Sequence, residues 1–582
     1  MSEQPRPRWR RTTQTLALVS LSLALLLSLA ASPRSHAATL AVSTTDDELL
    51  VNGNCSLREA IESFTSNSAV DACPAPDAQD DTIILPAGVY TLTQGELAID
   101  RSGSLALIGA GAGQTIIDAG NASRAFAISG GANVTISGVT IRNANGAGQS
   151  GGAIFADGAT LTVRNSVIAD SRARYGAGIY VNDSTLTVED STISGNVAAT
   201  RGGGIFSYSS NTTIVNTTIY DNSVTGTEDA GPYDGGGIRT FHTSTITIRN
   251  STIAGNSAAG DGGGIANSTD SPATVTLSNT ILAGNSDGGG NAPDCIGAIG
   301  SGGYNLVGNP NGCGFAAGGT GDLTNADPQL GPLQDNGGLT PTMAIAESSP
   351  ARDAGDPACA GADQRGIARP QGGRCDIGAF EYVGAPTIAA LSPSAALAGD
   401  PELTLTVTGS NFVSGLSTVR WNGAPRATTW VSSRELQATI PASDLAAAGT
   451  ASVTVHTSLP TDGGTSDGAT FTINNPTPTI GGLSPSAATA GSGEITLTIT
   501  GSGFVSDSTA HWNGSPRDTT FVSGTQLTVS IPASDLAAAG TASVTVVNPG
   551  PGGGTSDGAT FTINNPAPTL GSLSLARVPL GG

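Results

Sequence analysis

The chain has 582 residues, too many for one hydrophobic core, so we expect several folding units. It contains 81 glycines and only 12% charged residues, which disfavours helical bundles and coiled coils because their outer faces need Glu, Lys and Arg. All 24 basic residues are arginines and the net charge is −22, which excludes lysine-dependent chemistry and argues against nucleic acid or an anionic membrane as a partner.

Residues 1–37 are typical of an export signal. Several arginines precede an apolar run from Leu16 to Ala31, and Ser35, His36 and Ala37 resemble a cleavage site. The run of about 16 apolar residues is shorter than the roughly 20 that a membrane-spanning helix needs. We therefore predict an exported protein, secreted or at the cell surface, with no transmembrane segment in the mature chain.

The six cysteines of an exported chain favour disulfides. They fall in three close sequence pairs, and nearest-neighbour pairing is the simplest of fifteen connectivities. These pairs are Cys55 with Cys73, Cys295 with Cys313, and Cys359 with Cys375. A metal site is the rival interpretation, but no C-x-x-C pair or nearby histidine supports it, so we expect no metal and no cofactor.

Residues 38–81 are predicted to cap the N-terminal end of a larger fold. Ser56 and Glu59 match the capping box at the start of a helix, and Leu57, Ile61 and Phe64 give that helix one apolar face. The run CSLREAI at residues 55–61 resembles the signature of the CSLREA domain, which is found at the start of exported bacterial β-helix proteins.

Residues 82–318 carry a repeat of about 26 residues. Strand-like segments with alternating Thr or Ser and Ile or Val start at residues 134, 161, 186, 212, 246 and 275. A glycine-rich element precedes each later copy and ends at residues 154, 179, 205, 238 and 265. Helical repeats lack this period of two, and three short strands per repeat resemble a right-handed parallel β-helix.

Two polar columns recur at turns of this repeat. One contains Asn165, Asp190, Asn216, Asn250 and Asn279, and the other contains Asn196, Asn222, Asn256 and Asn285. Side-chain amides stacked from coil to coil can bond one another and the turn backbone. We predict internal structural ladders rather than a binding site.

A catalytic site is the alternative within the β-helix, since this fold also hosts polysaccharide lyases and glycoside hydrolases. Its best location is the loop 222–235 with Glu228, Asp229, Tyr233 and Asp234, which coil stacking could bring near Arg201, Arg239, His242 and Asp261. No paired-aspartate run or Gly-His-Gly pattern is present. We therefore expect solvated loop carboxylates and no enzyme.

Residues 319–383 follow the coils with a spaced series of motifs. They include DPQLGPL at 327–333, SPARDAG at 349–355, DQRG at 363–366 and CDIGAFE at 375–381. The series resembles the choice-of-anchor Q domain, which accompanies such β-helices. We predict a C-terminal cap, with Arg365 and either Asp376 or Asp353 as internal partners.

Residues 384–475 and 476–566 are two copies of one module. PTIAALSPSAALAG at 386–399 returns at 478–491, and SDGATFTINNP at 466–476 returns at 556–566. Alternating strands over about 90 residues favour a β-sandwich. The turns around Phe412 and Phe504 and the tryptophans Trp421 and Trp512 resemble IPT/TIG domains of immunoglobulin-like fold, with the tryptophans as packing residues. Residues 567–582 resemble the start of an incomplete third copy.

The sequence thus predicts an all-β protein in which a capped β-helix is displayed on sandwich spacers. We expect a non-catalytic adhesion or binding protein for a polysaccharide, matrix or cell-surface ligand. A lyase or hydrolase using residues 222–239 is the first alternative, and a passive structural component of the envelope is the second.

Overall fold

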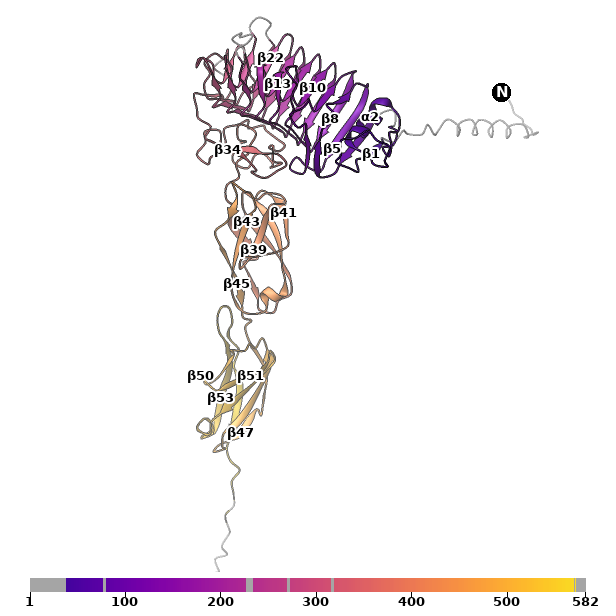
Figure 1. The fold of residues 1–582 in the computed structure, drawn as a ribbon. Helices are drawn as coiled ribbons and strands as arrows, with labels where there is room; N and C mark the ends of the chain where they lie inside the picture. The colour runs from indigo at the N-terminus through magenta and orange to yellow at the C-terminus, as the bar shows by residue number, and fades with distance from the viewer. Residues whose placement is uncertain are drawn as a thin grey trace, which may run out of the picture. The chain divides into compact units, whose positions relative to one another are not determined.

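The computed structural model describes residues 38–76, 80–226, 234–268, 273–315, 319–569 and 571 (Figure 1). The predicted export signal, residues 1–37, and nearly all of the predicted third repeat lie outside the described residues. The chain divides into two compact units, Met1–Tyr382 and Val383–Gly582. The first is a parallel β-solenoid with its flanking segments and the second is a pair of β-sandwiches, which confirms the predicted fold class.

The N-terminal segment contains strand β1 (Thr39–Ala41) and helix α2 (Leu57–Ser66). The Ser56 side chain accepts a hydrogen bond from the Glu59 backbone, and the Glu59 carboxylate accepts one from the Ser56 backbone, so the capping box is complete. Helix α2 packs Leu57, Ile61 and Phe64 into the solenoid core, and the Cys55–Cys73 disulfide joins the residues on either side of the helix. Strand β1 extends the first solenoid sheet because it pairs with the next strand in parallel.

The solenoid has four parallel sheets, and corresponding segments of successive coils lie side by side (Figure 1). The first sheet contains, in spatial order, β1, β2 (Asp80–Leu85), β5 (Gly103–Gly109), β8 (Ala132–Ser137), β11 (Thr160–Arg164), β15 (Thr185–Glu189), β19 (Asn211–Val215), β23 (Thr245–Arg249), β27 (Thr274–Ser278) and β31 (Gly300–Ser301). The second contains β4 (Leu97–Ile99), β7 (Phe126–Ile128), β10 (Ile154–Asp157), β14 (Ile179–Asn182), β18 (Ile205–Tyr208), β22 (Ile238–Phe241), β26 (Ile265–Asn267) and β30 (Cys295–Ile296).

The other two sheets complete the coils. The third contains β3 (Gly88–Thr91), β6 (Thr115–Asp118), β9 (Thr140–Arg142), β12 (Val167–Ala169), β16 (Thr192–Ser194), β20 (Thr218–Tyr220), β24 (Thr252–Ala254), β28 (Ile281–Ala283), β32 (Leu306–Val307) and β33 (Leu323–Thr324). The fourth contains β13 (Arg172–Tyr175), β17 (Val197–Arg201), β21 (Ser223–Val224), β25 (Ser257–Ala258) and β29 (Ser286–Asp287).

Period-two alternation explains the solenoid core. In β11 and β15, Leu161 lies beside Leu186 and Val163 beside Val188, and all four side chains are fully buried. The glycine-rich elements form the corner before five strands of the second sheet, namely β10, β14, β18, β22 and β26. Gly235 there has φ +68°, and a Cβ atom on Gly204 would come within 2.6 Å of the Gly237 carbonyl oxygen, so only glycine fits.

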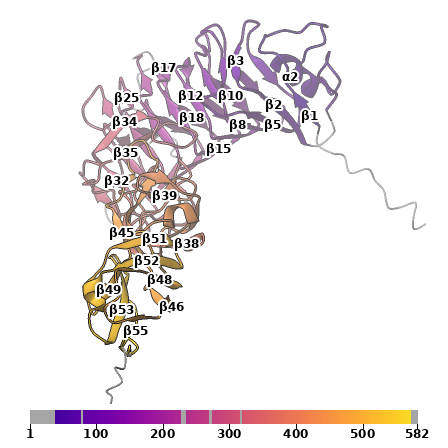
Figure 2. The same cartoon turned by 90° about the horizontal axis from the view of Figure 1, so that it is seen from below.

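Residues 319–382 form a segment that we call the lateral segment. Its strand β33 pairs with β32 and extends the third sheet, while β34 (Leu330–Gln334) and β35 (Thr342–Ile345) form an antiparallel pair. Ile345 of β35 packs with Ile281 and Leu306 of the third sheet. Figure 2 shows β34 and β35 beside the end of the solenoid that contains β32. The segment predicted as a cap therefore also runs along one flank of the solenoid.

Two β-sandwiches of the same topology follow. In the first, one sheet contains, in spatial order, β36 (Thr387–Ser392), β38 (Leu403–Ser410), β42 (Glu435–Ile440) and β41 (Thr428–Ser432). The facing sheet contains β37 (Ala395–Leu397), β45 (Ala469–Asn474), β43 (Gly449–Thr457), β39 (Ser417–Trp421) and β40 (Ala424–Pro425). Strand β44 (Gly464–Thr465) pairs with β43, and the short helix η1 (Ala442–Leu445) follows β42. In the second, one sheet contains, in spatial order, β46 (Thr479–Ser484), β48 (Ile495–Ser502), β52 (Gln526–Ile531) and β51 (Thr519–Ser523). The facing sheet contains β47 (Ala487–Thr489), β55 (Ala559–Asn564), β53 (Gly540–Asn548), β49 (Thr509–Trp512) and β50 (Ser515–Pro516). Strand β54 (Gly554–Thr555) pairs with β53, and the short helix η2 (Ala533–Leu536) follows β52.

Each sandwich core is apolar and centred on an aromatic pair. The ring centroids of Trp421 and Phe471 lie 5.1 Å apart, and those of Trp512 and Phe561 also lie 5.1 Å apart. Both tryptophans are only 3% exposed, so they pack the sandwiches and offer no surface platform.

Candidate binding face

The outer side of the second sheet carries a cluster of aromatic residues that we call the aromatic face. It consists of Phe155, Tyr180, Phe206, Tyr208 and Phe241, joined by Tyr175 from the fourth sheet. These six residues include three of the chain's eight tyrosines and three of its twelve phenylalanines, although aromatic residues make up only 4% of the sequence. The cluster therefore concentrates scarce side chains on one surface.

Strand register explains how four coils build this face. Phe155, Tyr180 and Phe206 occupy one outward-facing column on β10, β14 and β18. Tyr208 and Phe241 occupy the neighbouring column on β18 and β22. Their sequence neighbours, such as Ile154 and Ile179, point inward and are fully buried, as strand alternation requires.

The rings contact one another along the solenoid. Phe155 and Tyr180 are stacked with centroids 5.6 Å apart, and Tyr180 meets Phe206 edge to face at 5.3 Å. Tyr208 lies 5.7 Å from Phe241. Phe206 is 5% exposed and forms the floor, whereas the other five rings are partly exposed. Partly exposed aromatic clusters of this kind are typical of ligand-binding surfaces.

Polar groups border the aromatic face on two sides. On one side, the guanidinium of Arg124 lies 4.9 Å from the centre of the Phe155 ring and pairs with Glu96 at 3.0 Å, and Arg174 lies 5.1 Å from Tyr175. On the other, Asn182 donates to the Asp157 carboxylate at 2.6 Å. Burial raises the pKa of the Tyr180 phenol, so this hydroxyl remains protonated and can donate a hydrogen bond.

The predicted catalytic cluster lies beside this face. Asp234 lies close enough to Arg201 and Arg239 for both guanidiniums to lower its pKa, but burial has the larger effect and raises it. The Asp234 carboxylate accepts a hydrogen bond from the Gly260 backbone at 2.7 Å, and Arg239 donates to the Ala266 carbonyl at 3.3 Å. Asp234 is 4% exposed and Arg239 is 2% exposed. These charged groups therefore stabilise the corner through hydrogen bonds instead of facing solvent.

The other predicted catalytic residues are dispersed. Burial and the neighbouring Asp287 raise the pKa of Asp261, whose backbone carbonyl accepts a hydrogen bond from Asp234. His242 lies at the opposite end of β22 from Asp234, where it packs 4.7 Å from Tyr208 and belongs to the edge of the aromatic face. Glu228, Asp229 and Tyr233 lie outside the described residues. Across the ranges given above, no group of three or more Asp, Glu, His or Cys side chains is arranged to hold a metal ion.

One of the two polar columns forms a buried ladder. Each side-chain amide donates at 2.9 Å to the Oδ1 atom of the next member, in the order Asn196, Asn222, Asn256, Asn285 and Asp294. Each amide also donates to the backbone carbonyl of an isoleucine one coil away. The ladder lies inside the solenoid, and its amides bond one another and the backbone instead of a ligand.

The other column fixes turns instead of forming a continuous ladder. Its members Asn165, Asp190, Asn216, Asn250 and Asn279 all have φ between 46° and 49°, a left-handed conformation that Asn and Asp tolerate best. Among the described side chains, hydrogen bonds within the column join only Asn216 to Asp190 and Asn279 to Asn250, both at 3.0 Å. Backbone conformation therefore explains these residue types better than stacking.

Comparisons with known proteins agree with this architecture. The family model described as the right handed beta helix region matches residues 123–315, and the IPT/TIG domain model matches residues 386–473 and 478–563. The chain combines a right-handed β-helix with two IPT/TIG domains. No curated protein matches it.

Similarity to solved structures is weak. Matches include the extracellular region of plexin A4 (16% identity, covering 28% of this chain and 16% of that chain, TM-score 0.14). They also include the SGBP-B protein of a Bacteroides ovatus mixed-linkage glucan utilization locus in complex with a heptasaccharide (18%, 32% and 47%, 0.14) and a 1.5-MDa bacterial ice-binding adhesin (20%, 33% and 67%, 0.16). The chain spans less than half the length of the first two structures, and likenesses this weak say nothing about function.

The outer side of the third sheet differs from the aromatic face because the lateral segment covers it. Gln364 accepts a hydrogen bond from Thr218 at 2.7 Å and donates to Thr192 at 3.0 Å, so it bridges two coils of the β-helix. The Thr252 hydroxyl accepts a bond from the Ala379 backbone at 3.1 Å. Outward-facing threonines of the third sheet are therefore covered by the chain itself.

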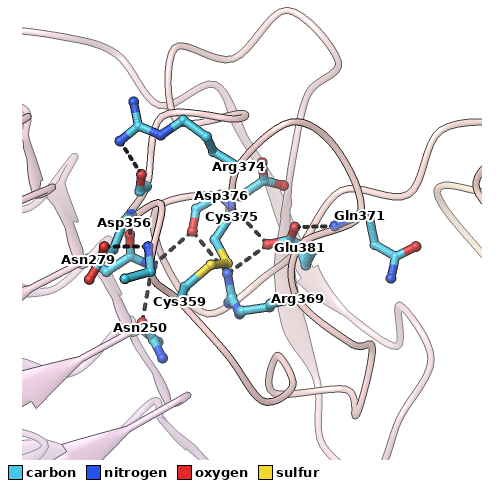
Figure 3. Close-up of a disulfide and its surroundings, with 12 residues drawn as sticks. Asn250, Asn279, Asp356, Cys359, Arg369, Gln371, Arg374, Cys375, Asp376 and Glu381 are labelled. Carbon is cyan, nitrogen blue, oxygen red and sulfur yellow. Dashed lines mark hydrogen bonds and ion pairs between the residues drawn. A yellow bond between two sulfur atoms is a disulfide. The ribbon is translucent and has the colours of Figure 1, made fainter. Parts of the chain in front are cut away.

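Two buried ion pairs hold the lateral segment together, and Figure 3 shows the one between Arg369 and Glu381. Arg369 pairs with Glu381 at 2.9 Å and Arg365 with Asp363 at 2.9 Å, and all four side chains are inaccessible to solvent. Arg365 thus pairs with Asp363, which the sequence prediction did not name, because the turn at 363–366 folds the two side chains together. Asp376 accepts a hydrogen bond from the Asp353 backbone at 2.7 Å. Burial and the neighbouring Glu381 raise the pKa of Asp376 to about 7. The Cys359–Cys375 disulfide closes the same region.

A cavity of about 600 Å³ lies between the β-helix and the lateral segment. Asp294 and Asn309 line it, but the Asp294 carboxylate already accepts hydrogen bonds from Asn285 and Asn309. The third disulfide, Cys295–Cys313, closes the coil that precedes this cavity.

In the described part of the chain, no helix is long and apolar enough to cross a membrane.

The aromatic face was missed at the level of sequence, although a signal for it exists. Phe155, Tyr180 and Phe206 each follow the isoleucine that ends a glycine-rich element. Their spacing of 25 and 26 residues equals that of the repeat, so reading one outward position down the coils would have found the column.

Proposed function

We propose that the protein is exported and acts, secreted or at the cell surface, as a non-catalytic binding protein that presents the aromatic face of its β-helix to a glycan, matrix or cell partner. The IPT/TIG domains serve as spacers. The observation that carries this proposal is the cluster of six aromatic residues over four coils, five of them partly exposed. Aromatic rings with polar tips suit a ligand that has both apolar and hydroxylated surfaces.

Export is supported by three disulfides and by the signal-like residues 1–37. The CSLREA-like and choice-of-anchor-Q-like motifs fit a surface protein of bacterial type. The enzyme alternative is disfavoured because Asp234 and Arg239 are almost fully buried and bonded to the backbone of neighbouring coils.

Binding of the full mature chain to a glycan array and to cells tests this proposal. We expect Tyr180→Ala and Phe155→Ala to weaken binding by about tenfold or more, since truncating a central aromatic contact removes at least one to two kcal/mol. Tyr180→Phe keeps the ring and should retain most of the affinity. Tyr220→Ala, which removes a partly exposed tyrosine from the third sheet, is the matched control and should bind normally.

A polysaccharide panel with and without Ca²⁺ separates binding from catalysis. We expect no release of reducing or unsaturated sugars. Product formation that is lost on Arg201→Ala or Asp234→Ala would replace this proposal with a lyase or hydrolase. Blank results from the glycan array and the cells together would instead leave a passive structural component.

A further inference from the structure

The aromatic face continues at one edge into a row of polar side chains. Asp157, Asn182 and Tyr208 end strands β10, β14 and β18 and occupy one register, so a carboxylate, an amide and a phenol lie side by side on successive coils. Phe155 lies two residues before Asp157, and strand alternation places such positions on the same side of a sheet. Tyr180 lies in the same relation to Asn182. The polar row and the aromatic rings therefore belong to one surface.

A hollow of about 460 Å³ lies beyond this row, at the turn that leads into the first sheet. A Cβ atom on Gly158 would meet nothing within 4 Å, so the hollow is open there. Its volume falls within the range of ligand sites. We call the hollow, together with Asp157 and Asn182, the polar corner. Its lining includes Gly158, Asp183 and Ser209 from the turn and Thr160, Thr185 and Asn211 from the first sheet.

The polar corner has unused hydrogen-bonding capacity. The Asn182 amide donates to the Asp157 carboxylate at 2.6 Å and to the Asp183 carboxylate at 3.3 Å, which holds both carboxylates at the rim of the hollow. In the described part of the chain, the second oxygen of each carboxylate forms no hydrogen bond with the protein, and neither do the hydroxyls of Thr160 and Thr185. These groups can accept hydrogen bonds from the hydroxyls of a ligand.

The position of these acceptors beside aromatic rings points to a sugar. Threonines are common on strand surfaces because of their β-propensity, so their hydroxyls alone carry no argument. A sugar ring presents C–H groups on its faces and hydroxyls at its edge, and it is held where an apolar surface adjoins hydrogen-bond acceptors. Phe155 and Asp157 supply both on a single strand.

The charges of the polar corner are of one sign. Asp157 and Asp183 are exposed, and across the described residues no arginine pairs with either of them. The arginines of the aromatic face, Arg124 and Arg174, lie on its opposite border, and Arg124 is paired with Glu96 at 3.0 Å. A carboxylate or sulfate group on a sugar in the polar corner would therefore meet two like charges.

We propose that the polar corner is a second subsite of the aromatic face and takes an uncharged, hydroxyl-bearing sugar unit. Asp157 and Asp183 determine this specificity, because they accept hydrogen bonds from hydroxyls and repel anionic groups. The aromatic rings hold an adjoining unit of the same glycan. This inference rests on the proposed function, since it names the class of glycan that the aromatic face binds.

Calorimetric titration of the full mature chain with cellohexaose, mannohexaose and xylohexaose, each compared with its sulfated derivative, tests this specificity. We expect the wild type to bind at least one neutral hexaose and to bind its sulfated form about tenfold more weakly at low salt. High salt should narrow the difference, because it screens the repulsion between exposed charges.

Removing the two charges should remove the discrimination. Asp157→Asn with Asp183→Asn keeps the shape of both side chains, and we expect the sulfated hexaose to bind within about threefold of the neutral one. Asp170→Asn with Asp221→Asn is the matched control, since both are exposed aspartates with left-handed backbone directly after strands of the third sheet. The control should keep the preference of the wild type.

Circular dichroism and thermal unfolding establish that each variant is folded before its binding is compared. Binding of a sulfated hexaose as tightly as its neutral form, with both lost in Tyr180→Ala, overturns this inference while the proposed function stands. So does a preference for neutral hexaoses that persists in the folded Asp157→Asn, Asp183→Asn variant. Absence of binding to every hexaose, or binding that Tyr180→Ala leaves unchanged, overturns the proposed function and this inference together.

Discussion

The second and third sheets of the β-helix are built from the same repeat, yet their outer sides differ. The third sheet presents Thr192, Thr218 and Thr252, which are buried because the lateral segment covers them and hydrogen-bonds two of them through Gln364. The second sheet presents Phe155 and Tyr180, which remain partly exposed in the described part of the chain.

The difference shows how one scaffold separates a covered flank from an open one. Small polar side chains on the third sheet allow a neighbouring segment to approach closely and to bond in a fixed register. Bulky aromatic side chains on the second sheet stack on one another from coil to coil and leave their edges available. Variants that affect the covered flank alone, or both flanks together, therefore test this division.

Removing the buried cation of the covered flank has the largest expected effect. In Arg369→Met, the Glu381 carboxylate remains buried without its partner, and we expect the free energy of unfolding of the first unit to fall by about 3–5 kcal/mol. Denaturant unfolding measures the loss. Arg352→Met removes partly exposed pairs with Glu347 at 3.6 Å and Asp353 at 3.8 Å and should cost less than about 1 kcal/mol. Equal losses in the two variants would contradict the role given to the buried pair.

Breaking the asparagine ladder affects both flanks because it runs inside the β-helix. In Asn222→Ala, the backbone N–H of Asn196 and the carbonyl of Ile193 lose buried partners, so we expect a loss of about 2–4 kcal/mol. Thermal unfolding followed by circular dichroism gives the change. Asn211→Ala alters an exposed asparagine of β19 and should change stability by less than about 0.5 kcal/mol. A small effect at Asn222 would mean that the ladder is dispensable.

Raising the pH has the smallest expected effect and is confined to the covered flank. The pKa of Asp376 is raised from its ordinary 3.8 to about 7, so between these values the native state holds a proton that the unfolded state has lost. Stability from this group therefore falls as the pH rises from about 4 to 7 and levels off above pH 7. At about 1.4 kcal/mol per pH unit, the loss between pH 5 and pH 8 is about 2–3 kcal/mol. Asp376→Asn should remove this dependence when unfolding is measured at pH 5 and pH 8, whereas an unchanged slope would assign it to another carboxyl.

Much of the β-helix could be predicted from sequence because its contacts recur at the period of the repeat. The alternation of Leu161 and Val163 with threonine specifies which side of the strand is buried, and the glycine elements mark the corners. The aromatic column recurs at the same period. Comparing the outward-facing position of successive coils would have revealed it.

The placement of the lateral segment could not be predicted in this way. Gln364 lies 172 residues from its partner Thr192, and no periodicity connects them. The choice of Asp363 as the partner of Arg365 depends on a local turn, while the burial of Asp234 and Arg239 depends on three coils packing together. Such contacts follow from tertiary packing and leave no pattern in the sequence.

Hydroxyl-radical footprinting of the full mature chain, with and without a bound glycan or cell-surface ligand, tests the role of the open flank most directly. We predict that the ligand protects Phe155, Tyr180, Tyr208 and Phe241 from oxidation, while Tyr220 on the third sheet and Trp430 in the first IPT/TIG domain are unchanged. Protection of Tyr220 or Trp430 with no change at the four aromatic residues would contradict the assignment of the aromatic face as the binding surface.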